Sequence, residues 1–150
     1  MKDEREPLTD EEYVYRRVLM VDVDENLEMP VAVTGFSPTK DDAGGISVYR
    51  AGFVTPEELD QAGRRSGEYY VVRLRVGEIR DREMDVIADP MEPLRGHALI
   101  PEIRYGLKGN AKMRLRELRL RLAQLANHHA IVLRPTCGSG PSGLSKAPIR

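Results

Sequence analysis

The sequence has little cysteine, few aromatic residues and no long apolar run. It contains a single cysteine, Cys137, among 150 residues, and only 5% of its residues are aromatic. One cysteine excludes an internal disulfide framework and a zinc site built from several cysteines. No run of eighteen apolar residues occurs, which excludes a membrane-spanning helix, and the acidic first twelve residues do not resemble a secretory signal. We therefore expect a cytoplasmic protein with no membrane partner.

The composition is that of a globular domain with a strongly ionised surface. Hydrophobic residues make up 41% of the chain and charged residues 31%, which excludes a collagen, a coiled-coil rod and a wholly disordered chain. The length suits one domain, which we place at residues 12–135. Residues 1–11 are predicted to be an acidic flexible tail, and residues 136–150, rich in Gly, Ser and Pro, a second flexible tail.

The distribution of apolar residues predicts a single α+β domain with a mixed or mainly antiparallel sheet of five or six strands. A short helix is expected after Thr55-Pro56-Glu57-Glu58, which has the spacing of a capping box and a proline at the first helical position. It should end near Gly63 or Gly67. A long C-terminal helix rich in Arg and Leu is expected over residues 110–127. The candidate strands are residues 13–23 (for which a helix remains open), 30–36, 46–49, 69–76, 86–88, 97–100 and 130–133.

Charge is distributed unevenly along the chain. Residues 13–103 contain eleven basic and seventeen acidic side chains, whereas residues 104–150 contain ten basic side chains and one acidic, Glu117. A basic end of this kind either meets an anionic partner or folds back on the acidic part of the same chain. We favour folding back, because the whole chain has a net charge of only −1.

The long helix carries apolar residues on two sides. Its main stripe consists of Leu115, Leu118, Leu122 and Leu125, at helical spacing. Met113 and Leu120 lie on nearly the opposite side, with arginines on the flanks, namely Arg114, Arg116 and Arg121. Apolar anchors with arginines at the rim are typical of protein interfaces. We therefore predict a non-enzymatic module that binds a protein partner or associates with itself through this side, and that needs no cofactor.

The alternative hypothesis is an enzyme that uses NAD, either an ADP-ribosyltransferase or an NAD hydrolase. An arginine fork, Arg16 or Arg17, suits the pyrophosphate of the cofactor. The other candidates are Ser47, the ring of Tyr49 and a carboxylate at Glu78 or Glu102. His97 is a candidate general acid or base, but we favour a structural histidine because no nearby residue is an evident catalytic partner.

Two further patterns have simpler explanations. The arginines of the long helix suit phosphates, so weak nucleic-acid binding through the basic end is a third hypothesis. We favour a solvated or internally paired face because no signature of a nucleic-acid fold accompanies them. Asp22, Asp24, Asn26 and Glu28 alternate as in a calcium loop, but the positions that need Gly and Glu hold Leu27 and Val33. We therefore expect no metal site.

Several short motifs resemble those of a group of small bacterial proteins with no activity attached. The motifs are Tyr15-Arg16-Arg17-Val18, Gly35-Phe36-Ser37-Pro38, Ile46-Ser47-Val48-Tyr49-Arg50, Ala88-Asp89-Pro90 and His97-Ala98-Leu99-Ile100. Together they cover roughly residues 12–103. The resemblance implies a bacterial source and carries over no catalytic residue.

Overall fold

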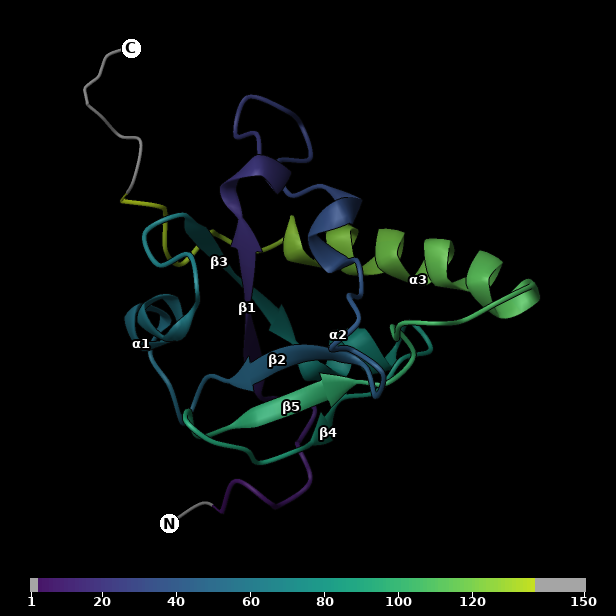
Figure 1. Cartoon of the computed structure of the whole chain (residues 1–150), viewed down its shortest axis with the longest axis horizontal. Helices are drawn as coiled ribbons and strands as arrows, with labels where there is room; N and C mark the ends of the chain where they lie inside the picture. The colour runs from purple at the N-terminus through teal and green to yellow at the C-terminus, as the bar shows by residue number, and fades with distance from the viewer. Residues whose placement is uncertain (1–2, 137–150) are drawn as a thin grey trace.

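The computed structural model describes residues 3–136, and its centre is a five-stranded antiparallel sheet in the order β3-β1-β2-β5-β4 (Figure 1). This confirms the predicted α+β class. The strands are β1 (Tyr13–Leu19), β2 (Ile46–Arg50), β3 (Tyr69–Arg75), β4 (Ile87–Ala88) and β5 (His97–Ile100). The helices are α1 (Pro56–Ala62), α2 (Val76–Arg80) and α3 (Asn110–Ala126), with short 3-10 helices η1 (Met20–Asp22) and η2 (Val33–Phe36).

The two predicted helices are confirmed, and each covers a different face of the sheet. The side-chain oxygen of Thr55 accepts a hydrogen bond from the Glu58 amide at 3.1 Å, and the Glu58 carboxylate accepts one from the Thr55 amide at 2.8 Å. This capping box begins α1 as the sequence predicts. α1 buries Leu59 completely and packs on β3 and β1. In Figure 1, α1 and α3 lie on different sides of β1.

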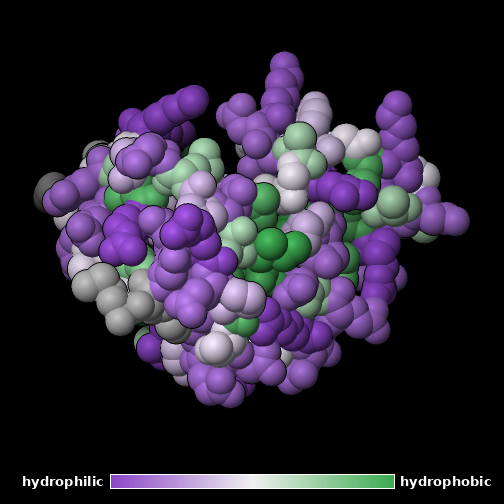
Figure 2. All heavy atoms as spheres, turned by 90° about the horizontal axis from the view of Figure 1, so that it is seen from below, coloured by the Kyte–Doolittle hydropathy of each residue, from purple (hydrophilic) through white to green (hydrophobic). Residues whose placement is uncertain are grey.

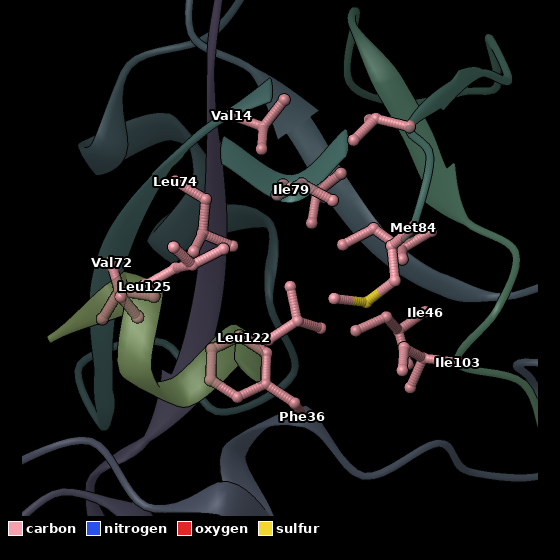
Figure 3. Packing of buried hydrophobic residues seen from close by; sticks show 14 of the residues in the cluster. Val14, Phe36, Ile46, Val72, Leu74, Ile79, Met84, Ile103, Leu122 and Leu125 are labelled. Atoms are coloured by element: carbon pink, nitrogen blue, oxygen red, sulfur yellow. The ribbon is translucent and has the colours of Figure 1, made fainter. Parts of the chain in front are cut away.

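The main core lies between the other face of the sheet and α3. The predicted leucine stripe of α3 faces it: Leu118, Leu122 and Leu125 are buried, and Leu115 packs partly buried at its edge. Figure 3 shows Leu122 beside the ring of Phe36 from η2, among side chains that the strands supply. Burial of this leucine stripe stabilises α3, because in proteins most helical stability comes from packing of an amphipathic face rather than from intrinsic propensity.

Residues 30–36, predicted as a strand, instead make one bridge and a 3-10 turn. Val23 pairs with Val31, and residues 33–36 form η2. The amide side chain of Asn127, after α3, replaces a neighbouring strand: it accepts from the Val31 N–H at 2.9 Å and donates to the Val31 carbonyl at 3.0 Å. The predicted strand 130–133 is likewise reduced to a single bridge, between Val71 and Leu133. The backbone of Val31 thus finds its hydrogen-bond partners without an adjacent strand.

Residues 3–11 differ from the predicted flexible tail. The Arg50 guanidinium at the end of β2 is completely buried, and it donates to the backbone carbonyls of Glu4 at 3.1 Å and Glu6 at 2.7 Å. Leu8 is 4% exposed and belongs to the core. A buried guanidinium needs acceptors for its N–H groups, and this segment supplies them. Of the second predicted tail, all but Thr136 lies outside the described residues.

Candidate functional site

The strand register gathers polar side chains on the sheet face that does not carry the main core. Tyr49 of β2 lies opposite His97 of β5, and Ser47 lies opposite Leu99. Because side chains alternate across a strand, these four point away from the core residues between them. Ser47 and Tyr49 are half-buried, whereas His97 is 3% exposed. The imidazole of His97 is thus buried, whereas the neighbouring Ser47 is partly accessible to solvent.

His97 has hydrogen-bond partners at both ring nitrogens. Its Nδ1 lies 2.8 Å from the backbone carbonyl of Asp89 and 3.2 Å from the Asp89 carboxylate, and its Nε2 lies 2.8 Å from Ser47 Oγ. A carbonyl oxygen only accepts hydrogen bonds, so Nδ1 carries a proton, and in the neutral ring Nε2 then presents a lone pair. In that tautomer the Ser47 hydroxyl donates to His97 Nε2. This is the arrangement in which an imidazole takes the proton of an attacking serine.

Two local features of the chain bring these three residues together. Asp89 directly follows the two-residue strand β4, and its amide donates to the His97 carbonyl at 2.9 Å, which sets Asp89 beside the imidazole. Ser47 lies two residues after Gly45, which has a φ of +134° and passes so close to β5 that a Cβ there would lie 2.5 Å from the Ile100 carbonyl oxygen. Only glycine adopts this conformation at such an approach without strain. β2 can therefore start directly alongside the end of β5.

Ser47, Tyr49 and His97, which we call the polar row, are extended onto β1 by aromatic and cationic groups. The ring of Tyr49 meets the His97 ring edge to face, with centroids 5.2 Å apart. The Arg17 guanidinium lies 5.6 Å from the centroids of both Tyr49 and Tyr69, and it donates to the Leu59 carbonyl at 2.9 Å. The structure thus brings Arg17, Tyr49, His97 and Ser47 into one continuous set of contacts.

Arg16, the other arginine candidate, lies on the opposite face of the sheet. It donates to the Gly35 carbonyl at 2.9 Å and to the backbone carbonyl of Ser47 at 2.8 Å. Burial lowers the pKa of Arg16 to about 10, because desolvation disfavours the charged form. Arg16 therefore supports the backbone of β2 behind Ser47 and does not face the hydroxyl.

The glutamates of the NAD hypothesis are engaged elsewhere. The Glu78 carboxylate lies 2.8 Å from His129 Nε2, and that of Glu102 accepts from the Asp85 amide at 2.9 Å. Neither joins the polar row. The carboxylate that does join it is Asp89, which sequence reasoning missed. The one available signal was that Asp89 and His97 flank a Pro-rich loop, a spacing compatible with two ends of neighbouring strands.

The predicted docking side of α3 is exposed. Met113 is 69% and Leu120 43% exposed. Two of the three flanking arginines are partnered: Arg114 pairs with Glu83 and Glu117, and Arg121 donates to the Arg82 carbonyl at 3.2 Å. Arg116 is exposed.

The basic end folds back on acidic residues in part, as we expected. Besides Arg114, Arg134 forms an ion pair with Glu25 at 2.8 Å. Other cations of this end remain together around a surface hollow of about 720 Å³, with no acidic residue in its lining. Its basic residues are Arg104, Lys108, Lys112 and Arg119. The nucleic-acid hypothesis would have to rest on this hollow.

Residues 3–136 contain neither a cluster of metal-ligating side chains nor a helix suited to a bilayer. No group of three or more His, Cys, Asp or Glu side chains there is arranged to hold a metal ion. None of the helices in the same range combines the length and apolar composition needed to span a bilayer.

Comparison of the chain with family models, with curated proteins and with solved structures finds no match in any of the three.

Proposed function

We propose that the chain is a serine-dependent hydrolase of small esters, with Ser47 as the nucleophile, His97 as the general base and Asp89 as the group that orients the imidazole. The observation that carries this proposal is the 2.8 Å contact between Ser47 Oγ and His97 Nε2, with Asp89 at the other ring nitrogen. The expectation that His97 is a structural histidine depended on its having no evident catalytic partner. With Ser47 and Asp89 on its two nitrogens, that premise no longer holds.

The reaction follows from these three groups. Ser47 Oγ attacks the ester carbonyl carbon as its proton passes to His97 Nε2. The bond from the carbonyl carbon to the alkoxy oxygen then breaks, and the departing alcohol takes the proton from Nε2. Water, deprotonated by the same nitrogen, attacks the acyl-serine, and the proton returns to Ser47 Oγ as the carboxylic acid leaves. The Asp89 carboxylate stabilises the imidazolium that forms in each step.

The residues beside Ser47 favour an apolar acyl group. Leu99 lies directly across from Ser47, and Ile87 of β4 lies across from Leu99 on the same face, 49% exposed. Cross-strand neighbours of this kind are about 5 Å apart, so the two side chains form an apolar shelf next to the hydroxyl. Figure 2 views the molecule from below, the side on which β4 and β5 lie in Figure 1, and shows hydrophobic residues in the middle of a mostly hydrophilic surface.

A fluorophosphonate probe tests the proposal, because it reacts covalently with activated serines and leaves ordinary ones unmodified. We expect mass spectrometry to find the label on Ser47, and labelling to be lost in Ser47→Ala. His97→Gln should slow it by at least about a hundredfold, the usual contribution of a general base. Asp89→Asn should slow it less, since the Asp89 backbone carbonyl still holds the Nδ1 proton.

Ser37→Ala is the matched control. Ser37 Oγ is also hydrogen-bonded, to Arg119 at 2.6 Å, but no imidazole faces it. Its removal should leave labelling unchanged. If the wild-type protein takes up no label while Ser47→Ala only lowers the melting temperature, the three residues merely join the strands and the proposal is wrong.

A further inference from the structure

A second exposed apolar surface, of opposite charge to the α3 surface, lies at the far end of β1. We define the acidic tip as residues 20–29, which run from η1 into the following loop. Four of its residues are apolar and exposed, namely Met20 at 40%, Val21 at 83%, Leu27 at 58% and Met29 at 40%. The segment also contains four acidic residues, one of which is Glu25, and no basic residue. Figure 1 shows it projecting beyond the sheet.

The corresponding surface on α3, the helix patch, consists of Met113, Leu120, Lys112 and Arg116. Lys112 and Arg116 are exposed, and within residues 3–136 neither forms an ion pair with a carboxylate. Glu83 and Glu117 pair with Arg114 and Arg121 instead, so the positive charges of Lys112 and Arg116 are not neutralised by them. The helix patch is therefore apolar and positive, whereas the acidic tip is apolar and negative.

The acidic tip cannot reach the helix patch of its own chain. Its base is held at Val31, whose backbone is paired with the Asn127 side chain just after the end of α3. Met113 lies fourteen residues earlier on the helix, about 21 Å away along its axis. Asp24 and Glu25 are turned toward the chain's own loop and Arg134. A contact between the two surfaces therefore needs a second molecule.

We propose that the protein associates with itself head to tail, with the acidic tip of one copy seated on the helix patch of another. Burial of Val21 and Leu27 against Met113 and Leu120 supplies the apolar contact. Glu28 opposite Arg116 or Lys112 sets the orientation, since like charges there would repel. Both surfaces are small, so the association is weak and reversible. Because the two surfaces differ, the contact is heterologous, and it generates rings or open chains.

Two complementary variants test this mode of association. Val21→Lys with Leu27→Lys disables the acidic tip and leaves the helix patch intact. Met113→Glu with Leu120→Glu does the reverse. We expect the wild type to show a concentration-dependent rise in mass by sedimentation, and each variant alone to stay monomeric. An equimolar mixture should form one-to-one dimers and stop there, because each pair retains only one working tip and one working patch.

Met91→Glu is the matched control, since Met91 is 55% exposed and belongs to neither surface. It should associate as the wild type does. The association should also weaken between about 0.05 M and about 0.5 M salt, where the Debye length becomes short. A wild type that remains monomeric at all concentrations overturns the proposal. So does a mixture of folded variants, checked by circular dichroism, that fails to form dimers.

Discussion

The Arg50 guanidinium, which is 0% exposed, forms two parallel hydrogen bonds with the Glu12 carboxylate, from Nε to Oε1 and from Nη2 to Oε2, each at 2.9 Å. This pair joins the end of β2 to the residue just before β1. With the two carbonyls that Nη1 reaches, it fastens residues 3–12 across the end of the sheet. An acidic segment that reads as a tail in the sequence is thereby part of the folded domain.

Removal of this arginine should therefore cost much of the stability of the fold. We expect Arg50→Met to lower the free energy of unfolding by about 3–5 kcal/mol, because it leaves the Glu12 carboxylate and two carbonyls without their buried donor. Urea unfolding measures the loss. Arg95→Met is a suitable control: Arg95 pairs with Glu4 and lies over Phe53 as Arg50 does, but its side chain is 56% exposed. Its loss should be below about 1 kcal/mol.

Two leucines of α3 should differ strongly in their effect on stability. Leu122 is completely buried and Leu120 is 43% exposed, only two residues away. Leu122→Ala should lower the free energy of unfolding by about 2–5 kcal/mol through lost burial and the cavity left behind. Leu120→Ala should change it by less than about 0.5 kcal/mol. Equal losses in thermal or urea unfolding would contradict the orientation of α3 on the core.

Glu25 should contribute stability at neutral pH and lose it in acid. Hydrogen bonds from Arg134 and Tyr70 hold the pKa of Glu25 below its usual 4.5. A carboxyl whose pKa is lower in the folded state stabilises that state above the unfolded pKa, and the contribution disappears as the pH falls through the folded pKa. Glu25→Gln should therefore be less stable than the wild type by about 0.5 kcal/mol at pH 7, the size of an exposed pair. The difference should shrink steadily below pH 4.5. A difference independent of pH would show that the charge plays no part.

Incubation with NAD should release no nicotinamide. The arginine fork that faces the polar row, Arg17, is held between Tyr49 and Tyr69, and the candidate glutamates Glu78 and Glu102 have partners elsewhere. Cleavage of the glycosidic bond would then lack the carboxylate that the hypothesis requires. Release of nicotinamide that is lost in Arg17→Ala, measured by chromatography, would restore the NAD hypothesis and count against ester hydrolysis.

Features that depend on a few neighbouring residues could be read from the sequence. The capping box at Thr55 places its donor and acceptor three residues apart, and the stripe from Leu115 to Leu125 repeats within one helix. Both patterns are local, so helix geometry alone decides them. The prediction of a strand at residues 30–36 was wrong because the backbone N–H of Val31 is hydrogen-bonded by the side chain of Asn127, ninety-six residues later. No local pattern reports such a partner.

The candidate site could likewise be predicted only in part from the sequence. Chemistry alone singles out Ser47, Tyr49, His97 and the two arginines, because few residue types can move protons or hold charge. Whether they cooperate depends on strand register, in which a shift of one residue moves every side chain to the opposite face. The sequence alone therefore predicted α1 and α3, the class of fold and most of the candidates. Only the tertiary structure separated Arg16 from Arg17, set Asp89 beside His97 and brought Ser47 Oγ within hydrogen-bond distance of the imidazole, since each of these relationships joins distant segments through sheet pairing.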